Sequence, residues 1–200
     1  DTKRYFPAGN AERAGLRRRL GLPEDRPLIV FPAPHAQSPI VAAMAWVRKV
    51  ARAMPDCNFL ITGAIDGNRP RREGNLLFTG FVDNYADHLR AADCLFCPIE
   101  LGGGTKLKLI EAAAAGLPIV ALAEAIRGTS FRPGEHVVLA EPRVEVMVAD
   151  LRAVLSDADG SARMGAAASR HARAEHDWDD IAEIMDRALE RLVHGTAPEP

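Results

Sequence analysis

Six short apolar runs, each unbroken rather than alternating, constrain the fold of this 200-residue chain more than any other feature. Unbroken runs are typical of strands that are buried on both faces of a parallel sheet. They cover residues 27–33, 58–63, 75–80, 93–98, 117–122 and 136–140. Because segments with helical spacing separate most of them, the sequence predicts an α/β fold: a doubly wound, Rossmann-like parallel sheet of about six strands with helices on both faces.

Local start and stop signals mark the helices. Pro39 suits the first turn of one helix, and Asp83 is an N-cap candidate for another. Gly116, with Pro118 just beyond it, is typical of a helix C-terminus. Apolar spacing and these signals predict helices over residues 39–54, 83–92, 104–115, 144–155 and 181–192. The chain is therefore expected to close with helices.

The charge balance and the cysteine content exclude several classes of protein. With 25 basic and 27 acidic side chains and a formal net charge of -2, the chain lacks the electrostatic surface that DNA or an anionic membrane requires. No run of roughly 18 apolar residues is present, the first residues do not resemble a signal peptide, and three cysteines are too few for a disulfide framework. We expect a cytoplasmic protein with one domain over residues 1–194 and a frayed tail over residues 195–200.

A glycine-rich turn follows the fourth predicted strand. Gly102, Gly103 and Gly104 precede a helix that is expected to begin near Thr105. Glycines let backbone N–H groups approach a ligand closely, and a helix N-terminus presents unpaired N–H donors and about half a positive charge. The turn therefore predicts a phosphate-binding site. It matches neither the Walker P-loop nor the GxGxxG dinucleotide motif.

Three charged side chains follow the turn. Lys106 and Lys108 oppose the helix dipole in the expected first turn, so their presence is better explained by a nearby anion. Glu111 comes three residues after Lys108 and shares its helix face, where a carboxylate can accept hydrogen bonds from ribose hydroxyls. Phosphate and ribose together describe a nucleotide. The alternative is that the turn is a plain connection and the lysines are solvated.

The run GGGTKLKLIEAAAAGLPIVA over residues 102–121, with the segments around it, resembles a known family. It is similar to the C-terminal, donor-binding domain of family 4 (group 1) retaining glycosyltransferases of the GT-B fold. The resemblance extends over residues 1–192 and is most specific in the middle third of the chain. It implies that an N-terminal, acceptor-binding domain lies upstream and is absent from this chain.

The resemblance also implies site roles. Glu111 would bind the ribose, the backbone of residues 103–105 would hold the diphosphate or the sugar, and Lys106 or Lys108 would neutralise phosphate charge in place of a metal. The donor would be a UDP- or GDP-sugar, with no cofactor. The residues implied to flank the nucleobase are Gly80, Phe81 and Val82.

The chain departs from its relatives at two places. Many relatives carry a second glutamate eight positions before the ribose-binding one, where this chain has Gly103, and Glu100 is a possible substitute. Many also carry an arginine and a lysine in the loop after the first strand, where this chain offers only His35 as a titratable side chain. These departures favour nucleotide binding over turnover.

We therefore expect the donor-binding half of a retaining hexosyltransferase that moves a sugar to an acceptor glycan or lipid, with this chain alone inactive. Expected partners are the nucleoside diphosphate sugar and the absent domain, through which any membrane association would occur. No nucleic acid is expected to bind. Two alternatives stay open: a sugar-nucleotide epimerase of the same fold, and a non-catalytic nucleotide-binding or interaction domain.

Other clusters are expected to be structural. Cys94 and Cys97 lie three apart on a predicted strand, so their side chains point to opposite faces, which argues against a redox pair or a zinc site. The arginines at 17–19 and in the loop 68–73 are expected to be solvated, with the loop reaching a phosphate as the alternative. Asp177 is expected to cap the last helix, whose apolar stripe is either core or a surface facing the absent domain.

Overall fold

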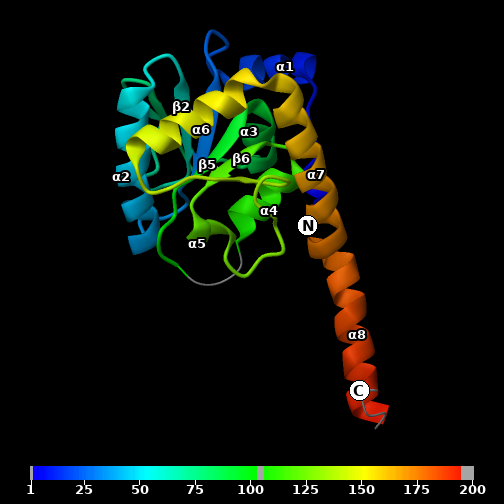
Figure 1. Cartoon of the computed structure of the whole chain (residues 1–200). Coiled ribbons are helices and arrows are strands. Elements are labelled where there is room, and N and C mark those ends of the chain that lie inside the picture. The colour runs from blue at the N-terminus through cyan, green and yellow to red at the C-terminus, as the bar shows by residue number, and fades with distance from the viewer. Residues whose placement is uncertain (1, 103–105, 195–200) are drawn as a thin grey trace.

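The computed structural model describes residues 2–102 and 106–194, and a seven-stranded sheet lies at its centre (Figure 1). The strand order is β3-β4-β2-β1-β5-β6-β7, and every neighbouring pair is parallel except β3 with β4. The strands are β1 (Leu28–Pro32), β2 (Asn58–Thr62), β3 (Arg71–Glu73), β4 (Leu76–Gly80), β5 (Cys94–Cys97), β6 (Ile119–Ala121) and β7 (Val138–Leu139). The predicted doubly wound sheet is confirmed.

Helices cover both faces of this sheet (Figure 1). A short 3-10 helix, η1 (Thr2–Arg4), precedes eight α-helices in the described residues. These are α1 (Asn10–Leu20), α2 (Ser38–Ala53), α3 (Tyr85–Ala91), α4 (Leu107–Ala114), α5 (Ala123–Ile126), α6 (Val144–Ser156), α7 (Ala158–His176) and α8 (Trp178–His194).

Two apolar layers form because neighbouring residues of a strand point to opposite faces. Ile29 and Phe31 of β1 pack in one layer with side chains of α2 and α6, whereas Leu28 and Val30 pack in the other with α3, α4 and α7. All five residues of β1 are buried, and each large apolar side chain buried in this way contributes about 1.5–3 kcal/mol. The burial of both faces explains why the apolar runs are unbroken.

The two cysteines of β5 follow the same alternation. Cys94 packs in the layer of α2 and α6, and Cys97 packs in the opposite layer. The prediction that they point to opposite faces is therefore confirmed. Both are buried free thiols, and burial raises the pKa of Cys97 to about 11.

Three expectations about local structure were wrong. The loop 68–73 contains the edge strand β3, which pairs antiparallel with β4, and within it Arg71 pairs with Glu73 and Asp66 and stacks over the ring of Phe78. The N-cap of α3 is Asn84 rather than Asp83. Helix α4 begins at Leu107, so Lys106 is its N-cap rather than a first-turn residue.

A fourth expectation, about Arg17, was also wrong. It was predicted to be solvated, yet it is buried and donates to the carbonyl of Ala91 at 2.8 Å and to Asp93 Oδ2 at 2.7 Å. Asp93 also accepts a hydrogen bond from the backbone N–H of Leu28. The pair therefore fixes α1 against the amino ends of β1 and β5.

Helix α8 extends away from the sheet, almost in line with α7 (Figure 1). Most of its large apolar side chains are exposed, and Asp177, which precedes it, accepts a hydrogen bond from the Asp179 N–H as a helix cap does. The exposed residues include Trp178, Ile184, Met185, Leu189, Leu192 and Val193. No helix within residues 2–102 and 106–194 has the length and apolarity needed to cross a bilayer.

The carboxyl ends of β1, β2 and β4 are joined by a close backbone approach at Gly63. Gly63 has a φ of 108°, and its N–H donates to the carbonyl of Gly80 at 2.8 Å. The next N–H, of Ala64, donates to the carbonyl of Pro34 at 3.1 Å. The loop after β1 is thereby held against the end of β2.

Replacing Gly63 with Ala should lower the free energy of unfolding by about 3 kcal/mol or more, because a left-handed φ is combined with a steric clash. A Cβ at this position would lie 2.5 Å from the carbonyl oxygen of Ala33 and 2.6 Å from Cα of Pro34. Urea denaturation measures the loss. Gly74→Ala is the matched control, since Gly74 has a φ of 60° and open space around it. It should cost only about 1 kcal/mol, so equal losses would show that the steric clash at Gly63 adds nothing.

Candidate functional site

The candidate site lies where the order of the parallel strands reverses. Counted along the chain, the six parallel strands lie in the order 3-2-1-4-5-6, so the connections after β1 and β5 leave in opposite directions. Open α/β sheets bind ligands in the crevice outside the carboxyl ends of the strands at such a point. The loops that border it are residues 33–37 after β1 and residues 98–102 after β5.

One cavity at this edge brings together four of the residues that the sequence singled out. It has a volume of about 430 Å³ and is lined by Phe81, Val82, Lys108 and Glu111 among others. Phe81 and Val82 come from the turn after β4, whereas Lys108 and Glu111 come from the first two turns of α4. Segments about 30 residues apart in the chain thus converge on one opening.

A second cavity, of about 370 Å³, adjoins the first. Gly102, Lys106 and Lys108 line it together with Gln37 from the loop after β1. Lys108 lines both cavities, so the two cavities meet at the start of α4.

Several candidate residues line neither of these two cavities or lie outside the residues that the structure describes. His35 is exposed and lines neither cavity, although Pro34 and Gln37 beside it do. Gly80 precedes Phe81 and packs closely against Asn68. The Glu100 carboxylate accepts a hydrogen bond from Nε1 of Trp46 at 2.9 Å. Gly103, Gly104 and Thr105 lie outside the described residues.

Burial shifts the pKa values of Glu111 and Lys108 in opposite directions, each toward the neutral form. Burial raises the pKa of the Glu111 carboxyl, and the hydrogen bond that Tyr5 Oη donates to Glu111 Oε1 at 2.9 Å opposes this rise. Burial lowers the pKa of Lys108, and the nearby Glu111 opposes that shift. The two half-buried groups therefore support each other's charged forms. The carboxylate can accept hydroxyl hydrogen bonds, and the ammonium group can hold an anion.

Lys106 is held by an acidic partner that the sequence analysis did not identify. Its Nζ lies 3.5 Å from Glu124 Oε1 and donates to the carbonyl of Gly102 at 3.3 Å. Glu124, on α5, also pairs with Nε of Arg127 at 3.0 Å. The Lys106 and Glu124 side chains are only 13% and 17% exposed, so the pair is largely shielded from water. No local pattern in the sequence indicates this contact.

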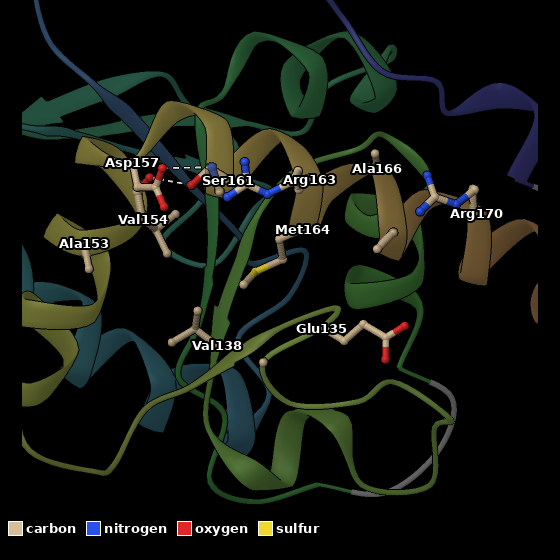
Figure 2. Close-up of a pocket in the computed structure, with 13 residues that line it drawn as sticks. Glu135, Val138, Ala153, Val154, Asp157, Ser161, Arg163, Met164, Ala166 and Arg170 are labelled. Carbon is tan, nitrogen blue, oxygen red and sulfur yellow. Dashed lines mark hydrogen bonds between the residues drawn. The ribbon is translucent and has the colours of Figure 1, made fainter.

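A third cavity, of about 750 Å³, lies apart from this site between α6, α7 and the segment before β7 (Figure 2). Arg163, Arg170 and Met164 of α7 border it. Asp157 also lines this cavity, and as the N-cap of α7 it accepts a hydrogen bond from the backbone N–H of Gly160. None of the candidate residues lines this cavity, and it lies away from the strand reversal.

Comparison with known proteins gave one family match. The family model described as "Glycosyl transferases group 1" matches residues 28–157. A GDP-mannose-dependent monoacylated alpha-(1-6)-phosphatidylinositol monomannoside mannosyltransferase of Corynebacterium glutamicum is 26% identical over 95% of this chain and 54% of its own length. This chain spans about half the length of the curated relatives it matches.

Solved structures share the fold. Sucrose-phosphate synthase from Thermosynechococcus elongatus superposes with a TM-score of 0.80 at 20% identity, over 98% of this chain and 51% of its own. Anabaena Alr3699/HepE, solved in complex with UDP and glucose, gives a TM-score of 0.76 at 15% identity, over 95% of this chain and 54% of its own.

Glu124→Gln should lower the free energy of unfolding by about 1–2 kcal/mol, because it leaves the shielded Lys106 ammonium without its carboxylate. Urea denaturation provides the measurement. Glu141→Gln is the control, since Glu141 pairs with Arg143 but both side chains are more than 60% exposed. The control should lose less than about 0.5 kcal/mol, and a similar loss in both variants would show that the Lys106–Glu124 pair adds nothing.

Proposed function

The chain belongs to the group 1 glycosyl transferases, and on this premise we propose that it is the donor-binding half of a retaining, metal-independent enzyme that uses a nucleoside diphosphate sugar. One observation carries the proposal: Glu111, Lys108, Phe81 and Val82 line a single cavity at the strand reversal. The GDP-mannose named for the corynebacterial relative supports a donor of this class.

The proposed binding mode uses the two adjoining cavities. The carboxylate of Glu111 accepts hydrogen bonds from the ribose hydroxyls, with the nucleobase beside Phe81 and Val82. The diphosphate lies toward Lys106 and Lys108. This order matches the polarity of the walls, because an anion meets the ammonium groups and a neutral diol meets the carboxylate.

The lysines also explain how the site would assist bond cleavage. Breaking the bond between the sugar and the diphosphate leaves negative charge on the departing phosphate oxygen. Fixed cations near that oxygen stabilise the transition state more than the ground state, which raises the rate. We assign this role to Lys106 and Lys108. Lys106 would exchange part of its interaction with Glu124 for the phosphate.

The other half of the enzyme would supply the acceptor site. Since this chain spans about half of its relatives, we propose that a second domain closes the cleft and that this chain alone transfers no sugar. The exposed apolar face of α8 is its proposed docking surface, because α8 extends beyond the sheet with large apolar side chains in solvent (Figure 1).

Binding of UDP or GDP should raise the melting temperature of the chain by about 5 °C or more at a concentration near 100 times the dissociation constant. Lys106→Ala and Glu111→Ala should each abolish the shift, because they remove the phosphate cation and the ribose acceptor. Glu183→Ala, on the exposed face of α8, should keep it. Differential scanning fluorimetry measures all four proteins.

The possible outcomes separate the alternatives. A parent protein whose melting temperature responds to no nucleoside diphosphate would exclude donor binding and favour a non-catalytic interaction domain. Isomerisation of a sugar nucleotide by the full-length protein without any acceptor would favour an epimerase. Sugar transfer by this chain alone would contradict the proposed division of the site between two domains.

Hydrogen exchange tests the docking of α8. In this chain alone the amides of α8 should exchange rapidly, because a 17-residue helix without packing is only marginally stable in water, whereas the buried α4 should be protected. In the full-length protein α8 should become protected. Equal protection of α8 and α4 in this chain alone would show that α8 needs no partner.

A further inference from the structure

Tyr5 makes a contact that links the start of the chain to the carboxylate of the proposed site. Its hydroxyl donates to Glu111 Oε1 at 2.9 Å, across 106 residues of sequence. The bond is partly buried, so it is less weakened by water than an exposed one. It occupies one carboxylate oxygen and leaves Oε2 available to other donors.

The position of Tyr5 is fixed by groups outside the site. Its ring packs edge-on against the ring of Tyr85, with centroids 6.3 Å apart. Arg173 of α7 donates to the carbonyl of Tyr5 at 2.6 Å and to the carbonyl of Ala114, at the end of α4, at 3.0 Å. One guanidinium therefore ties the segment of Tyr5 to the helix that carries Glu111. The hydroxyl is held in place before any ligand arrives.

Tyr5 and Glu111 together form a wall between two cavities. Both residues line the cavity of about 430 Å³ and a smaller one of about 200 Å³. His176 and Trp178, from the junction of α7 and α8, border the smaller cavity. The hydrogen bond from Tyr5 thus holds Glu111 Oε1 at the boundary between the two cavities.

We propose that Tyr5 is a positioning residue, whose hydroxyl orients the Glu111 carboxylate so that it receives the ribose hydroxyls of the donor. The proposal rests on the donor-binding function proposed above and deepens it. Tyr5 does not touch the reacting atoms. It acts through Glu111.

The charged and titratable groups around Glu111 determine how the loss of the Tyr5 hydroxyl changes the pKa of Glu111. Lys108 and Arg4 favour the ionised carboxylate, burial disfavours it, and the Tyr5 hydroxyl opposes the effect of burial. Tyr85 of α3 and His176 of α7 also line the cavities that Glu111 borders. Removing the hydroxyl should raise the pKa of Glu111 further, so a larger fraction is protonated as the pH falls.

Tyr5→Phe is the test, because phenylalanine keeps the ring packing on Tyr85 and removes only the hydroxyl. Isothermal titration with UDP and GDP should show a dissociation constant roughly tenfold higher in Tyr5→Phe than in the parent at pH 7.5, and a larger ratio at pH 5.5. Carbon-13 NMR titration of the glutamate carboxyls, with Glu111 assigned by Glu111→Gln, should show a higher Glu111 pKa in the variant. Unfolding by urea checks that both proteins are folded.

An unchanged dissociation constant, or an unchanged Glu111 titration, would overturn the role of Tyr5. The proposed function is tested separately by whether the parent binds nucleotide at all. If the parent binds none, donor binding fails, while the NMR comparison still shows whether Tyr5 controls Glu111. A purely structural role for Tyr5 would shift unfolding without altering the ratio of affinities between the two pH values.

Discussion

The reversal of strand order between β1 and β5 is the constraint on which the site depends. Right-handed crossovers place the helices after these two strands on opposite faces, so no crossover covers the space beyond their carboxyl ends. The loops 33–37 and 98–102 border that space. At Gly63 the loop after β1 is held against the end of β2, next to this space. The site is a product of the topology before any side chain is considered.

Helix α4 places charged side chains in this crevice. One face of α4 packs against the sheet with α7, and the other presents Lys108 and Glu111 to the cavities. Burial pushes both groups toward their neutral forms, and each other's charge opposes this. Keeping two opposite charges half-buried costs stability in the unliganded domain. A ligand with an anionic end and a hydroxyl-bearing end recovers part of that cost.

The start of the chain and the junction of α7 and α8 lie beside the site. The Thr2 hydroxyl donates a hydrogen bond to the Asp177 carboxylate, and Arg173 donates to the backbone carbonyls of Thr2 and Tyr5. The first residues of the chain and the first turn of α8 therefore border the same cavity as Glu111.

The sequence alone predicted the six parallel strands, the end of α4 just before Gly116 and the opposite orientation of Cys94 and Cys97, because periodicity and turn residues are local signals. It also selected Phe81, Val82, Lys108 and Glu111, which converge on one cavity, but it did not separate them from His35, which lies outside. The tertiary structure was needed to identify the strand β3, the burial of Arg17, and the partners of Lys106 and Glu111. Each of these depends on a residue distant in the chain or on an edge pairing, and a side chain's partner is set by how the elements pack, which no local pattern encodes.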